Sequence, residues 1–154
     1  MNPATLESDK LETCISVCKS LHRGEISAIS TYDQAVEKFA NEPYVAELRK
    51  IRESHAQSEE LLRNHILSMG GSPDTDGGAW ETFAKTVQAT ADFFGDNSAL
   101  SSLQMGEEHG EREYQDALAN DGVMEEMKET IRNILLPRVQ ADQQVLANLK
   151  EIYS

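Results

Sequence analysis

The sequence contains few of the residues that cross-link chains or interrupt helices. Among its 154 residues are two cysteines, four prolines and one tryptophan. Two cysteines cannot build a disulfide framework, so we expect a reduced, cytoplasmic protein. No apolar run reaches the length of about 18 residues that suggests a membrane span. The first residues show no basic segment followed by an apolar stretch, so we expect no signal peptide.

Positive charge is also scarce. Lys and Arg number 14 against 27 Asp and Glu, which gives a net charge of −13. This balance argues against nucleic acid and against an anionic membrane surface as partners, and it leaves a homo-oligomer or an unknown protein partner open. The chain has no glycine-rich phosphate loop, nucleophile elbow or dinucleotide fingerprint. Hydrolytic and phosphoryl-transfer enzymes are therefore unsupported.

Helical periodicity dominates what is present. Apolar residues recur at helical spacing over residues 5–40, 43–69, 98–119 and 123–153. Pro43 can open the second helix, Gly70-Gly71 can end it, and Pro137 predicts an interruption of the fourth. Residues 70–97 form a long connection with a short amphipathic helix, whose apolar face would cap the bundle end or bind a partner: Trp80, Phe83, Val87 and Phe94.

Connection lengths predict the topology. The first and third joints are only a few residues long, so each helix pair should form an antiparallel hairpin. The connection over residues 70–97 is long enough to cross the bundle, which would make the second and third helices parallel. We therefore predict an all-α four-helix bundle with one long crossover. It forms a single domain over residues 1–154, with hairpins at 5–69 and 98–153.

The two hairpins share a motif, Leu-x-x-Gly-Glu-x₆-Tyr-x-x-Ala. It occurs at residues 21–35 and again at residues 103–117, in register and 82 residues apart. The match predicts two copies of one hairpin related by an approximate two-fold axis.

Both matched glutamates lie on apolar helix faces. At ~100° per residue, Glu25 lies within about 20° of Cys18, and Glu107 lies between Leu100, Leu103 and Tyr114. A buried glutamate is costly without a partner. The other two helices offer His55 and Asp142 on their core faces, so each helix contributes one such side chain.

A family resemblance follows from these residues. The chain resembles a bacterial ferritin-like four-helix-bundle family of unknown function. The residues that carry the resemblance are Gly106-Glu107 with Tyr114 and Ala117-Leu118, Gly70-Gly71, Trp80 and Leu136-Pro137. The resemblance covers nearly the whole chain. It implies a fold and no named activity.

The pattern is more distantly similar to rubrerythrins and ferritins, which bind two irons. Their sites use one Glu from each of two helices and Glu-x-x-His from each of the other two. Glu25 and Glu107 match the single glutamates, but the other positions read His55-x-x-Ser58 and Val139-x-x-Asp142. This departure argues against di-iron chemistry.

Two interpretations of the four polar residues follow. The favoured one is a non-catalytic bundle in which Glu25, His55, Glu107 and Asp142 form a structural polar layer. Tyr32 and Tyr114 would be its hydrogen-bond donors. The alternative is a site with a non-standard ligand set for iron, manganese or zinc, which could serve a di-iron-type oxidoreductase.

The remaining candidate ligands have simpler explanations. Cys14, Cys18 and His22 follow at intervals of four and could clamp a soft metal, but without a fourth donor we expect core packing instead. Glu59 and Glu111 flank the layer and are interpreted as solvated charges at its rim. His65 and His109 receive no role.

Overall fold

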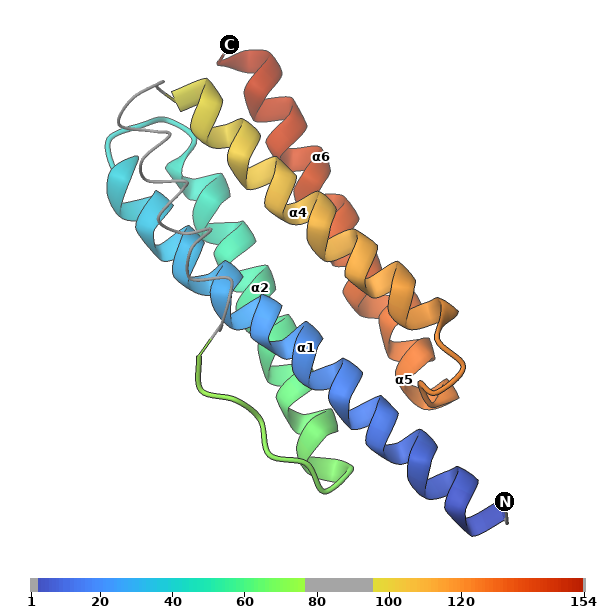
Figure 1. Cartoon of the computed structure of the whole chain (residues 1–154). Coiled ribbons are helices and arrows are strands. Elements are labelled where there is room, and N and C mark those ends of the chain that lie inside the picture. The colour runs from blue at the N-terminus through green and yellow to red at the C-terminus, as the bar shows by residue number, and fades with distance from the viewer. Residues whose placement is uncertain (1–2, 77–95, 154) are drawn as a thin grey trace.

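The chain folds into a bundle of long helices (Figure 1). The computed structural model describes residues 3–76 and 96–153. Their elements, in chain order, are α1 (Pro3–Lys38), α2 (Val45–Ser68), α4 (Asp96–Ala119), α5 (Glu125–Thr130), the π-helical segment η2 (Ile131–Leu135) and α6 (Leu136–Ile152). The last three run consecutively as one rod, and the described part of the chain contains no strand. The predicted all-helical bundle is confirmed, whereas the predicted short helix with Trp80, Phe83, Val87 and Phe94 lies outside the described residues.

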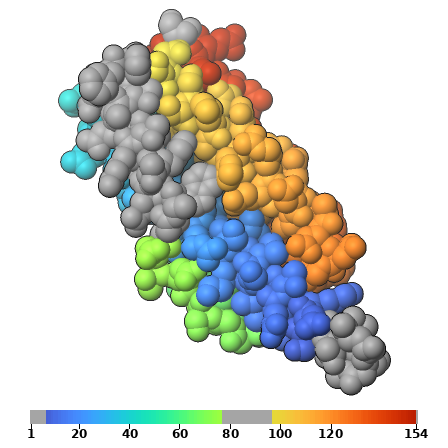
Figure 2. Space-filling model, viewed as in Figure 1, coloured from blue at the N-terminus to red at the C-terminus, as the bar shows by residue number. Residues whose placement is uncertain are grey.

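The helices are arranged as the connection lengths predict. α1 and α2 are antiparallel, as are α4 and α6, while α2 ends at the opposite end of the bundle from the start of α4 (Figure 1). α2 and α4 therefore run in the same direction. α1 packs against α2 and α4, and α6 packs against α4 and α2. Figure 2 shows α1 (blue) and α4 (yellow to orange) meeting along one face.

The end of α2 is set by two glycines. Gly70 has a φ of +87°, in the left-handed region. Its N–H donates to the carbonyl of Leu67, and the Gly71 N–H donates to that of Ile66 at 2.9 Å. This pairing is a Schellman cap, which satisfies carbonyls that the last helical turn leaves free. The predicted stop at Gly70-Gly71 is confirmed, whereas α2 begins at Val45 rather than at Pro43.

The final rod is interrupted before Pro137. Buried residues recur at intervals of four from Met127 through Ile131 and Leu135 to Val139. In a regular α-helix each such interval drifts by about 40°. The wider turn of η2 offsets this drift and places Asp142 on the core face. Pro137 cannot donate to the carbonyl four residues earlier, inside η2, which is the physical reason for the predicted interruption.

The apolar core is divided into two clusters. One contains Phe39, Leu48 and Leu100, toward the α1–α2 turn. The other contains Cys14, Leu62 and Ile131, toward the opposite end. Buried polar side chains lie in the sequence between the members of these clusters, on all four helical rods. No helix among the described residues combines the length and apolar character that a membrane span requires.

Two glycines offer a matched test of backbone conformation. A Cβ added at Gly70 or at Gly110 would meet no atom within 4 Å, but only Gly70 has a positive φ. Gly70→Ala should therefore lower the free energy of unfolding by about 1–2 kcal/mol. Gly110→Ala, inside α4, should raise it by about 0.5–1 kcal/mol. Urea denaturation measures both changes, and equal effects of the two substitutions would contradict the conformational explanation.

Candidate functional site: a buried polar layer

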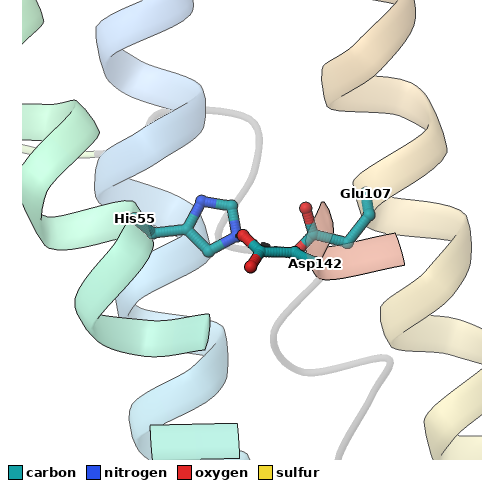
Figure 3. A group of neighbouring side chains, drawn as sticks. All are labelled: His55, Glu107 and Asp142. Atoms are coloured by element: carbon teal, nitrogen blue, oxygen red, sulfur yellow. Dashed lines mark hydrogen bonds and ion pairs between the residues drawn. The ribbon is translucent and has the colours of Figure 1, made fainter. Parts of the chain in front are cut away.

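Four helices each contribute one buried polar side chain to the centre of the bundle. Glu25 comes from α1, His55 from α2, Glu107 from α4 and Asp142 from α6, and their exposed fractions are 4%, 6%, 3% and 8%. Figure 3 shows His55, Glu107 and Asp142 pointing toward one another. The structure thus brings together all four residues that helical periodicity selected. We call this set the polar layer.

His55 is the centre of the polar layer. Its Nδ1 lies 2.6 Å from Oε2 of Glu25, and its Nε2 lies 2.6 Å from Oε1 of Glu107. When both carboxyl groups are ionised they only accept hydrogen bonds, so both ring nitrogens donate and the ring is an imidazolium. Tyr32 stacks on this ring with a centroid distance of 5.4 Å.

The two tyrosines of the repeated motif exchange partners between the hairpins. The Tyr32 hydroxyl donates to Oε1 of Glu107 at 2.6 Å, and the Tyr114 hydroxyl donates to Oε1 of Glu25 at 2.7 Å. Each tyrosine therefore binds the glutamate of the other copy of the motif. Tyr32 belongs to one apolar cluster and Tyr114 to the other, so the two hydroxyls reach the polar layer from opposite ends of the bundle.

A second pair of contacts links α2 with α6. The Ser54 hydroxyl donates to Oδ2 of Asp142 at 3.0 Å, and Arg138 Nη1 donates to the Ser58 hydroxyl at 3.3 Å. Helical periodicity did not identify Ser54 or Arg138. Both are half-buried and lie one position before a residue of the core face, so they carried no signal in the sequence.

The charges in the polar layer change several proton affinities. Burial disfavours the charged form of His55, but the carboxylates of Glu107 and Glu25 outweigh it and hold the His55 pKa well above 6.5. Burial and the charge of Glu107 raise the pKa of Asp142 to about 7. Burial and the neighbouring carboxylates also raise the pKa values of Tyr32 and Tyr114, so both hydroxyls keep their protons.

One buried carboxylate oxygen of the polar layer has no hydrogen-bond partner among the described residues. Glu107 Oε1 accepts from both His55 and Tyr32, while the buried Oε2 has no hydrogen-bond partner among the described residues. His55 Nε2 also lies 4.0 Å from Oδ2 of Asp142. One ligand atom from each of these three residues lies within 4.8 Å of the others. Nitrogen and oxygen donors in this combination suit divalent transition metals.

The other candidate ligands do not join this group. Cys14 and Cys18 are fully buried in an apolar cluster, and His22 Nε2 lies 3.3 Å from Glu59. Among the described residues, the three donors of the polar layer are the group close enough to share an ion. Glu59 also pairs with Arg63, and Glu111 pairs with Gln143. His109 pairs with Glu113, and His65 lies 3.4 Å from the Thr130 hydroxyl.

A small cavity adjoins the polar layer between α1 and α4. Its volume is about 40 Å³, and the buried residues that line it include Glu25, His55, Glu107 and Val139. The helices leave this space because small residues face it: Gly24, Ser27, Ala28, Gly106 and Gly110. A volume of this size accommodates at least one water molecule.

The raised pKa of Asp142 predicts a pH-dependent stability. The folded chain binds this proton more tightly than the unfolded chain, whose carboxyl has a pKa near 3.8. Through Asp142, the free energy of unfolding should fall by up to a few kcal/mol as pH rises from about 4 to about 7. Asp142→Asn should flatten the profile over this window.

Urea denaturation of the metal-free protein across this window is the measurement. His55, whose pKa is also raised, adds a loss of stability above pH 6.5 in both proteins. Asp121→Asn, which removes an exposed carboxylate outside the polar layer, controls for the change in net charge. Parallel profiles for the wild type and Asp142→Asn would contradict the assignment.

Comparison with known proteins identifies a family whose function is unknown. No curated protein and no solved structure matches the chain. A family model described as Domain of unknown function (DUF2383) matches residues 13–120. This range covers most of α1 and all of α2 and α4, including Glu25, His55 and Glu107, whereas Asp142 lies beyond it. The chain belongs to this family of unknown function.

Proposed function

We propose that the polar layer binds one divalent metal ion through His55, Glu107 and Asp142. The observation that carries the proposal is Oε2 of Glu107, which is buried without a hydrogen-bond partner beside two other converging donors. A buried carboxylate oxygen without a partner is costly. A cation held by the three side chains would satisfy it.

Each ligand already has a second partner that orients it. Glu25 holds the Nδ1 side of His55, Tyr32 holds Glu107, and Ser54 holds Asp142. Ligating histidines commonly donate their other ring N–H to a carboxylate, which sets the ring orientation and strengthens the ligand. In the proposed site Glu25 has this role, and the ion replaces the proton on Nε2. Three protein ligands leave further coordination positions beside the cavity.

The donor set also selects the kind of ion. It consists of one imidazole and two carboxylates, with no sulfur, and suits Mn²⁺, Fe²⁺ or Zn²⁺. A bound ion would supply a Lewis acid or, with iron or manganese, a redox centre. The chain's own residues orient the ligands and exclude bulk water from the site. We infer no reaction from these residues.

We further propose that the bundle is a duplicated, ferritin-like hairpin pair in which neither Glu-x-x-His motif is kept. The parallel α2 and α4 and the reciprocal tyrosine–glutamate bonds support this relationship. Val139, which lines the cavity, occupies the position in the second hairpin that His55 occupies in the first. With an apolar residue there, a single ion is the better expectation than two.

A purely structural polar layer is the competing hypothesis. Its support is that both ring nitrogens of His55 already have partners at 2.6 Å. The two hypotheses differ in one measurable quantity, the affinity of the folded protein for a divalent ion.

Calorimetric titration of metal-free protein with Mn²⁺ and Zn²⁺ tests the proposal. We expect one ion per chain, together with an ion-dependent rise in stability of about 2.7 kcal/mol when free ion reaches 100 times Kd. Glu107→Ala and Asp142→Ala should abolish binding. Glu25→Gln, which changes an orienting partner, should weaken it by about 10–100-fold.

Folding and charge are controlled separately. Glu107→Gln keeps the shape of the side chain if Glu107→Ala fails to fold, and it should still lose binding. Glu111→Gln removes a carboxylate from the same helix outside the polar layer and should bind as the wild type does. Failure of the folded wild type to take up either ion, or equal uptake by wild type and Glu107→Gln, would leave the structural layer as the explanation.

A further inference from the structure

The cavity between α1 and α4 lies where the two hairpins meet. Pairs of its lining residues occupy matching positions, 82 residues apart, in the two copies of the motif: Gly24 with Gly106, Glu25 with Glu107, Ala28 with Gly110, and Tyr32 with Tyr114. Small residues on both helices thus create the space.

The cavity wall contains two polar atoms without partners. Ser27 is 3% exposed, and its hydroxyl has no hydrogen-bond partner among the described residues. Glu107 Oε2 is the other such atom. In contrast, the hydroxyl of Thr31, which also lines the cavity, donates to the Ser27 carbonyl at 2.8 Å. Two residues that line this cavity thus carry buried oxygens without a hydrogen-bond partner, and a polar occupant of the cavity would satisfy them.

A carboxylate stands at the outer end of the cavity. Glu113 lines it, and its side chain is 26% exposed, so this wall reaches solvent. His109 Nε2 lies 3.0 Å from Glu113 Oε1 and is 45% exposed. Glu113 therefore lines the cavity at the surface, whereas Ser27 and Glu107 line it in the buried interior.

The α2–α6 side of the polar layer, opposite the cavity, carries a positive charge. Between α2 and α6, Arg138 contacts the Ser58 hydroxyl one turn from Asp142. A guanidinium stays protonated and repels cations. On the α1–α4 side, the partly exposed charged group is the carboxylate of Glu113. The chain as a whole has a net charge of −13. Electrostatic attraction therefore favours the α1–α4 side for an incoming cation.

We propose that the metal ion reaches the polar layer through the cavity between α1 and α4, with Glu113 as the outer carboxylate and the Ser27 hydroxyl as an intermediate oxygen donor. This inference rests on the proposed function. The ion sheds part of its water in passing from Glu113 to Ser27 and Glu107. Glu113 and Ser27 act on the rate of uptake and lie outside the final ligand set.

Rates of Mn²⁺ exchange distinguish a route from a ligand. Association is followed by loss of the free Mn²⁺ paramagnetic resonance signal after rapid mixing, and dissociation by a chase with excess chelator. Gly110→Leu fills the cavity from a position where a Cβ has open space. It should lower both rates by the same factor, at least ~10-fold, with Kd unchanged, because a narrowed route slows passage in both directions.

Glu113→Gln tests the outer carboxylate. It should lower the association rate several-fold at low ionic strength, with a smaller effect when salt screens the charge. Ser27→Ala should lower both rates together. Glu111→Gln, which makes the same charge change two residues away outside the cavity, should exchange Mn²⁺ as the wild type does.

Several outcomes would overturn the route. Unchanged rates in folded Gly110→Leu, or in Ala28→Leu if that variant does not fold, would place uptake elsewhere while leaving the metal site intact. If Gly110→Leu weakened Mn²⁺ binding through faster dissociation alone, the cavity would contribute to holding the ion rather than to its passage. Absence of equilibrium Mn²⁺ binding in the wild type would overturn the route together with the metal site, and it is detected separately by titration.

Discussion

A charged histidine ring held between two glutamates in the middle of an apolar core is the interaction on which the bundle depends. Buried charges are tolerated when they are paired and hydrogen-bonded. Here the pairing involves three helices, since His55 on α2 joins Glu25 on α1 to Glu107 on α4. Removing His55 would leave two buried carboxylates without their cation, and removing either glutamate would leave one ring nitrogen of His55 without its partner. The hydroxyls of Tyr32 and Tyr114 complete the set, so the apolar clusters on both sides are tied to the same polar layer.

This layer constrains the length and register of every helix. Its members must meet at one height in the bundle, although their helices begin and end at different places. The final rod meets the requirement through η2, which keeps Ile131, Leu135 and Val139 on one face despite intervals of four residues. Asp142 then faces the core three residues after Val139, at ordinary helical spacing. A π-helical turn close to a functional site is a recurrent feature of proteins. In this chain it has a specific consequence, the delivery of the fourth polar side chain.

Much of this arrangement could be predicted from the sequence because helical periodicity is a local property. Gly70-Gly71 marks the end of α2, connection lengths imply the parallel α2 and α4, and angular spacing puts Glu25 and Glu107 on core faces. The contacts between helices could not be predicted in the same way. Periodicity does not say that Tyr32 binds the glutamate of the other hairpin, and it gives no signal for Ser54 or Arg138 beside the core face. The cavity was also missed, because it results from the combined positions of small residues on two helices rather than from a pattern in either one.

The differences between the two halves explain how a nearly symmetric bundle can present an asymmetric site. The paired glutamates and tyrosines are the same in both motifs. In contrast, Val139 occupies the position in the second hairpin that His55 occupies in the first, and Glu113 occupies the position that matches Thr31. The first difference supplies imidazole from one side only, which suits one ion rather than two. The second supplies an outer carboxylate on one wall only, and Arg138 gives the α2–α6 side the opposite charge. The matched glutamates and tyrosines supply the hydrogen bonds that join the two hairpins. The unmatched positions determine how many ligands the proposed site has and from which side an ion would reach it.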